Sequence, residues 1–224
     1  MTQTLRVARL DFLTIQQYLG IRQLGFFLLI AFVLCYMNGT SSFSIGILMM
    51  YGLFYTAYPF AIGEKTKIDL LYASLPLQKK NLVFGRYLFA FLINLGSGVI
   101  AFLFTFLTAL VLRQDFILGE TAAAIVGCFF LFTLVEAIQM PFYFKLGYTK
   151  AKLLVFLPLI VVPAALFGLF RMAQERGLLD YFINLGNQVS QNPLPLILFC
   201  LLGWMLFIAI SVLCSLQNYH KREW

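Results

Sequence analysis

The chain has 224 residues, of which 62% are hydrophobic and only 11% are charged, and its formal net charge at pH 7 is +7. Soluble domains are about 45–50% apolar and about 25% charged, so this composition excludes an ordinary soluble globular domain. In so apolar a chain, the excess of lysine and arginine is a signal of membrane topology and does not indicate nucleic-acid binding.

Residues 1–22 precede the first long apolar stretch and predict a helix that lies along the membrane surface. Apolar residues recur there at alternating steps of three and four, which places them on one face of a helix. These residues are Leu5, Ala8, Phe12, Ile15 and Leu19. A basic amphipathic helix beside a membrane span is expected in the inner interface, and a plain extension of the first span is the alternative.

Six further stretches are candidates for membrane-crossing helices, each of which needs about 20 mostly apolar residues. They cover residues 23–37, 43–62, 87–112, 121–144, 152–170 and 194–216. The predicted fold class is therefore all-α, a polytopic membrane protein with six spans in one transmembrane domain over residues 1–224.

The distribution of lysine and arginine predicts the orientation of these spans. With the N-terminus inside, the inner segments hold 13 of the 16 basic residues, and the outer segments hold the other three. Cytoplasmic loops carry such an excess of positive charge. The sequence therefore predicts that both termini lie inside.

The loop between the second and third spans, residues 63–86, is charged and broken where the rest of the chain is apolar. Residues 67–73 can form a short amphipathic helix, because apolar residues recur there at helical spacing. Pro76 ends that helix, and residues 77–86 begin a second helix that continues into the third span. This shape suits docking onto a separate cytoplasmic protein, and an ordinary solvated loop is the alternative.

Two motifs resemble the small permease subunits of ABC-2 type transporters from Gram-positive bacteria. In "EKTKIDLLYASLPLQKKNLVFGRYLF", residues 64–89, an acidic residue and a lysine precede the short helix, and then come SLP, a basic pair and V-x-x-R-Y. The second motif is "PFYFKLGYTKAK", residues 141–152, a proline followed by an aromatic turn with lysine and glycine. Within that group the chain is similar to the exporter permeases for phenol-soluble modulins.

The resemblance implies a partner and a site. Each permease would bind a separate ATPase subunit, two copies per transporter, and would pair with a second copy of itself or with a similar permease. The loop would contain the coupling helix that docks on the ATPase. The implied coupling residues are Glu64, Lys67, Leu71, Ser74, Leu75, Pro76, Lys79, Lys80 and Arg86.

The resemblance also implies short helices at the outer face, and residues 171–193 leave room for a segment that dips back into the membrane. This segment could serve as a structural lid or as a gate for cargo, and the sequence leaves both alternatives open. Amphipathic or antimicrobial-type peptides are the implied cargo, exported across a bacterial cell membrane. A lipid-moving permease of the same family is an alternative.

Glu136 is the acidic residue inside the fourth predicted span, eight residues or about 12 Å of helical rise before Phe144. A carboxylate at that depth is costly unless it is paired or faces a cavity. Three roles are open. The first is a pair with a basic residue such as Arg86 or Lys145, and the second is a position in the lining of a translocation path. The third is a protonated carboxyl group at a dimer interface, hydrogen-bonded to Thr133 or Gln139 of the facing copy.

The sequence offers no residues for catalysis, for a metal or for a cofactor. It has one histidine, His220, which stands next to the C-terminus, so a two-histidine metal site and a Ser-His-Asp triad are both unsupported. No stretch has the glycine and lysine spacing of a phosphate-binding loop, so ATP is expected to bind the partner subunit. A membrane scaffold or sensor that transports nothing is the alternative from a different class.

Overall fold

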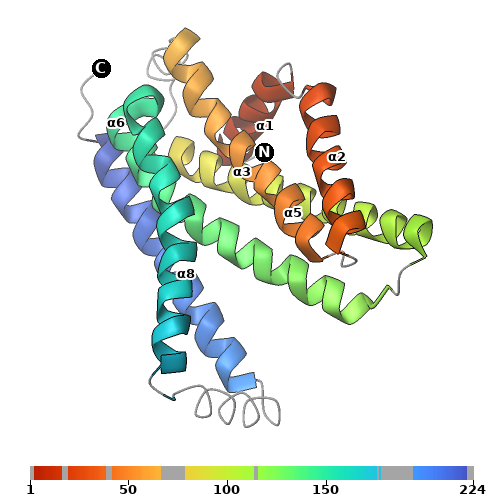
Figure 1. Cartoon of the computed structure of the whole chain (residues 1–224). Helices are drawn as coiled ribbons and strands as arrows, with labels where there is room; N and C mark the ends of the chain where they lie inside the picture. Colours follow the sequence, from red (N-terminus) through yellow and green to blue (C-terminus); the bar gives the residue numbers. More distant parts are fainter. Residues whose placement is uncertain are drawn as a thin grey trace.

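The computed structural model describes residues 3–16, 20–38, 42–66, 79–113, 116–175, 177 and 194–220, and every regular element among them is an α-helix (Figure 1). The elements are α1 (Gln3–Gln16), α2 (Ile21–Asn38), α3 (Ser42–Thr66), α5 (Lys79–Leu112), α6 (Leu118–Glu175) and α8 (Leu194–His220). The predicted all-α class is confirmed. α5 begins at Lys79 and continues to Leu112, which agrees with the predicted helix over residues 77–86 that continues into the third span. α3 differs from the prediction, because it continues past residue 62 to Thr66.

The long element α6 consists of two helical segments joined at Gly147, whose backbone has φ 77° and ψ 174°. This φ lies in the region that glycine reaches without a steric penalty. The break falls between the predicted fourth and fifth spans, so one element contains both. After the break, α6 extends to Glu175, so the first residues of the predicted outer segment 171–193 continue a helix.

Four helices are long and apolar enough to cross a membrane, within the part of the chain that the structure describes. They are Ser44–Thr66, Lys80–Leu112, Leu118–Ala151 and Ile197–His220. The apolar part of α2, Arg22–Met37, is shorter. The chain is thus a multi-pass membrane protein in composition and helix length, while the count of six spans and their orientation stay predictions.

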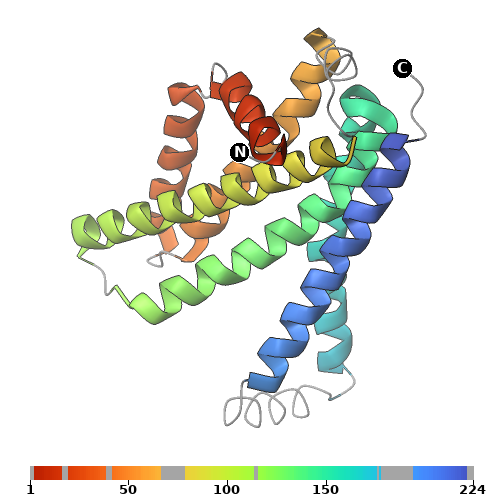
Figure 2. The ribbon, with the colours of Figure 1, turned by 180° about the vertical axis from the view of Figure 1, so that it is seen from behind.

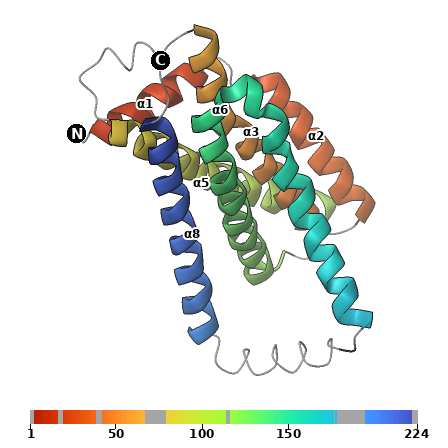
Figure 3. The same ribbon diagram turned by 90° about the vertical axis from the view of Figure 1, so that its left-hand side faces the viewer.

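The helices form a central packing unit and an extended arm. α3 packs against α5 and against α6, and α5 and α6 also pack against each other. α8 packs on α6 and α5. The end of α6 and the start of α8 extend beyond the rest of the bundle (Figures 1 and 3).

Helix α1 lies across the start of α5, as the view from behind shows (Figure 2). The two backbones approach closely at Gly85, where an added Cβ would lie 2.7 Å from the Cβ of Val7. Any larger residue at position 85 would push α1 away. The contact therefore selects which face of α1 is buried.

The predicted apolar face of α1 is correct only in part. Ala8 and Ile15 are buried as expected, but Leu5 and Phe12 are 42% and 47% exposed. The residue that takes their place against α5 is Val7. The exposed apolar side suits contact with lipid, so the interfacial location of α1 stays a prediction.

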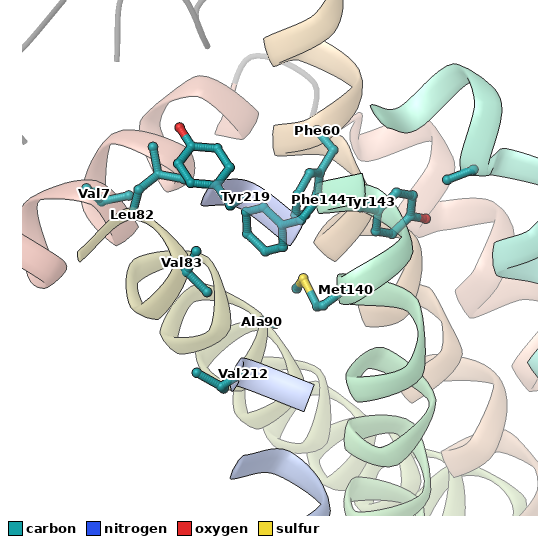
Figure 4. Close-up of a cluster of buried hydrophobic side chains, with 11 residues drawn as sticks. Val7, Phe60, Leu82, Val83, Ala90, Met140, Tyr143, Phe144, Val212 and Tyr219 are labelled. Atoms are coloured by element: carbon teal, nitrogen blue, oxygen red, sulfur yellow. The ribbon is translucent and has the colours of Figure 1, made fainter. Parts of the chain in front are cut away.

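Five helices meet in one cluster of buried side chains near the ends of α3 and α8 and the break in α6 (Figure 4). Two aromatic rings of α6, Tyr143 and Phe144, pack on Phe60 of α3 with ring centroids 4.8 and 5.1 Å away. Phe144 also contacts Tyr219 of α8 at 5.7 Å. The remaining labelled members are Val7, Leu82, Val83, Ala90, Met140 and Val212.

A hydrogen bond from α8 satisfies a backbone carbonyl that a proline leaves free. Pro141 has no N–H, so the carbonyl of Ala137, four residues earlier, lacks its helical donor. The hydroxyl of Ser211 donates to that carbonyl. Since the Ser211 proton is used there, Tyr87 of α5 must donate to Ser211 Oγ, at 2.6 Å. Pro141 thus both weakens α6 and creates the attachment point of α8.

Candidate functional site

The middle of the predicted coupling segment lies outside the described residues. This holds for Lys67, Leu71, Ser74, Leu75 and Pro76, and their role stays a prediction. The two ends of the segment are described. They show what the loop is anchored to.

Glu64, at the end of α3, is bound to the second motif. Its carboxylate Oε2 accepts a hydrogen bond from the backbone N–H of Thr149 at 2.9 Å. Thr149 follows the break at Gly147, so it lies in the first turn of a new helical segment, whose N–H groups lack intrahelical partners. A carboxylate is favoured at such a helix start. The two sequence motifs, 85 positions apart at this bond, therefore meet at one point.

The start of α5 has one exposed basic side chain and one polar side chain that contacts α1. α5 begins at Lys79, and the Lys80 side chain is exposed. Next to them, Asn81 donates to the Gln3 side chain of α1. Lys80 is thus available to a partner, while its neighbour fastens α1.

Arg86 lies inside the protein, only 3% exposed. Its guanidinium carbon is 4.2 Å from the ring centroid of Phe60 and 5.7 Å from that of Phe144. A guanidinium over an aromatic face is attracted by the negative face of the ring. The residue predicted to touch the ATPase therefore joins α3, α5 and α6 in this structure.

Glu136 lies between the three central helices and is 4% exposed. Its Oε2 accepts a hydrogen bond from the side-chain amide of Asn94 on α5 at 2.7 Å. The Thr56 side chain of α3 lies close to the same carboxyl group. An interhelical hydrogen bond of this kind stabilises a membrane bundle by about 1 kcal/mol, so Glu136 helps to hold the central helices together.

Two oxygens of this cluster have no hydrogen-bond partner among the described residues, Oε1 of Glu136 and Oδ1 of Asn94. Glu136 also borders a small cavity of about 70 Å³, which is large enough for water. The amide carries both a donor and an acceptor, so Asn94 can bond to a charged or a neutral carboxyl group. Pairing with Arg86 or Lys145, a translocation path and contact with a second copy all stay predictions.

Asn94 is the residue that sequence reasoning missed. It stands in the apolar run "AFLINLGSG" of the third span, and polar residues in such runs are rare enough to indicate a specific role. That signal was visible in the sequence. Its partner was not, because no pattern in either helix specifies which residues of α5 and α6 face each other.

A close approach of α3 makes this cluster compact. An added Cβ at Gly52 would lie 2.9 Å from Oγ of Ser97 and 3.6 Å from Oδ1 of Asn94. Small residues allow membrane helices to approach in this way. Gly52 therefore brings the α3 backbone directly beside the buried polar side chains of α5.

A comparison with protein families matches residues 9–220 to the family described as ABC-2 family transporter protein. The chain belongs to the ABC-2 transporter family. It is therefore a permease subunit of an ABC transporter, a membrane component that works with an ABC ATPase. The resemblance carried by the two motifs is confirmed at the level of this family. A search of curated proteins finds no match to the chain.

Proposed function

We propose that this permease is the transmembrane subunit of an ATP-driven exporter in a bacterial cell membrane and that it moves amphipathic peptides outward. Two copies of a separate ATPase would supply the energy. A second copy of the permease, or a similar permease, would complete the transporter. The ATP would bind only to the partner subunit.

The observation that carries this proposal is the meeting of the two motifs at the bond between Glu64 and Thr149. The segment proposed to dock on the ATPase follows the end of α3 and precedes the start of α5 in the chain, and the end of α3 is bonded to the first turn after the break in α6. The end of α3, the start of α5 and the break in α6 each belong to a helix of the central unit. A displacement of the loop would therefore act on α3, α5 and α6 together.

Arg86 supports the same route of coupling. It is eight positions from Asn94 on α5, about 12 Å by helical rise. Its guanidinium packs on rings of α3 and α6, and Asn94 bonds to Glu136 of α6. Two separate contacts thus make α5 move with α6 as one body, which is what transmission of a movement from the ATPase requires.

The test is mass spectrometry of the proteins that co-purify with the chain after gentle extraction from its native membrane. We expect an ATPase in near-equimolar amount, together with peptides as cargo. Replacing Leu71 or Leu75 by Asp should remove the ATPase, because a charge would disrupt the apolar docking face. Gln16→Asp, at an exposed position of α1, should leave it bound.

The possible outcomes separate the alternatives. Repeated preparations of intact permease without an ATPase would favour the scaffold or sensor. An ATPase accompanied by lipids and no peptides would favour the lipid-moving permease. Loss of the ATPase in Gln16→Asp as well would show that the Leu71 and Leu75 variants do not report on docking.

A further inference from the structure

A cavity of about 440 Å³ lies along one side of α3, between α2 and α6. Its floor is a stripe of α3 residues at helical spacing: Phe54, Tyr58, Ala61 and Lys65. Drug-sized ligands occupy cavities of about 300–1,000 Å³. The cavity is thus large enough for a ligand, and it is separate from the polar cluster around Glu136.

The walls of the cavity are aromatic. Tyr58 stacks on Tyr55 with ring centroids 5.3 Å apart, and Tyr148 of α6 stacks on Tyr143 at 6.1 Å. Tyrosine rings present an apolar body and a polar tip. Such walls suit a ligand with a long apolar part.

The charged end of the cavity is Lys65, whose side chain is exposed at the end of α3. No acidic side chain is among the described residues that line the cavity. The neighbouring Glu64 is directed to Thr149 through a hydrogen bond. The cavity therefore favours an anionic group at this end and disfavours a cationic ligand.

The size of the cavity decides between an amphipathic helix and a lipid. A helix with side chains is about 10–12 Å across, so 440 Å³ holds roughly one turn of it. An acyl chain is much thinner and can extend along the stripe from Lys65 to Phe54. The cavity thus fits a lipid with an anionic headgroup at the membrane surface.

We propose that this cavity binds an anionic lipid, with its headgroup at Lys65 and its acyl chain on the aromatic wall between α2, α3 and α6. The proposal goes beyond the transport function, because it holds whether the exported cargo is a peptide or a lipid. Lys65 lies at the predicted inner surface, where anionic lipids attract basic side chains. The site would tie the position of α3 to the composition of the inner leaflet.

The test uses the full-length permease in nanodiscs of phosphatidylcholine and two fluorescent probes, lysophosphatidylglycerol and lysophosphatidylcholine. We expect the anionic probe to bind about fivefold more tightly than the zwitterionic one, as one lysine near the surface predicts. Lys65→Gln should remove this difference. Lys80→Gln, an exposed lysine outside the cavity, should leave it unchanged.

A second variant tests the acyl chain. Ala61→Trp places a large ring in the middle of the stripe and should weaken both probes at least tenfold. Glycerol phosphate, which has the headgroup charge without the chain, should not compete with them. Equal binding of the two probes, an equal effect of Lys80→Gln and Lys65→Gln, or competition by glycerol phosphate would each overturn the proposal.

Discussion

Helices α3 and α8 are both apolar enough to cross a membrane, yet their surroundings are opposite. In the most apolar stretch of each helix, 61% of the α3 stretch is buried inside the protein, whereas only 6% of the α8 stretch is buried. α8 nevertheless has the highest mean hydropathy of the four candidate spans, and α3 has the lowest. The more apolar helix, α8, is therefore the one that is more exposed on the surface of the bundle.

The comparison shows what selects the interior of a bundle that lies in lipid. Lipid tails are as apolar as leucine, so burying a leucine against another helix gains little. Close packing and interhelical hydrogen bonds decide instead. α3 is buried because Gly52 allows close approach to α5 and because Ser44 and Thr56 lie inside the bundle.

The largest expected effect tests close packing. Gly52→Leu would force the new side chain against Ser97, and overpacking of this kind costs about 1–3 kcal/mol. We expect a lower melting temperature in detergent, followed by tryptophan fluorescence. The matched control is Gly203→Leu on α8, where an added Cβ meets nothing within 4 Å. Equal losses in the two variants would contradict the contrast between α3 and α8.

The next effect compares two interhelical hydrogen bonds by double-mutant cycles. One joins Asn94 to Glu136 at 2.7 Å inside the central unit, and the other joins Trp204 of α8 to Thr133 at 2.8 Å. We expect a coupling energy of about 1–2 kcal/mol for the first pair and about 0.5 kcal/mol for the second, since the first is fully buried. Alanine variants of each partner, singly and together, give the two values. A larger coupling for the α8 pair would reverse the assignment of the core.

The smallest expected effect concerns the attachment of α8. Tyr87→Phe removes the hydroxyl that bonds to Ser211 and Ser215 at 2.6 and 2.8 Å. The serine that donates to Ala137 keeps its own bond, so we expect a loss of only about 0.5 kcal/mol in unfolding free energy. Tyr36→Phe on α2, where the side chain is 71% exposed, is the control. A loss as large as that of Gly52→Leu would show that α8 belongs to the structural core.

Much of the helical layout followed from the sequence. The predicted stretches 43–62, 87–112 and 194–216 lie within α3, α5 and α8, and the predicted gap between the fourth and fifth spans contains the break at Gly147. Apolar length is a reliable signal, because in lipid a backbone without water must satisfy its polar groups within the helix. The end of α3 was less predictable, since that helix continues beyond the apolar residues to Thr66 in the charged segment.

The candidate site was predicted less completely. The unusual position of Glu136 was evident from its charge in an apolar run. Glu64 was identified as a candidate from its place in the first motif. Neither the bond of Glu64 to Thr149 nor that of Glu136 to Asn94 was expected. Arg86 was predicted to serve as a coupling residue, and only its location among aromatic rings showed how it also joins three helices.

The sequence by itself determined that this chain is a helical membrane protein of the ABC-2 type, because apolar length and local motifs depend on residues that are neighbours in the chain. The tertiary structure alone decided which side chains meet. The buried face of α1 depends on Gly85, the depth of α3 on Gly52, and the attachment of α8 on a carbonyl that Pro141 leaves free. Each of these contacts joins residues far apart in sequence, and the spacing within one helix holds no information about the surface of another.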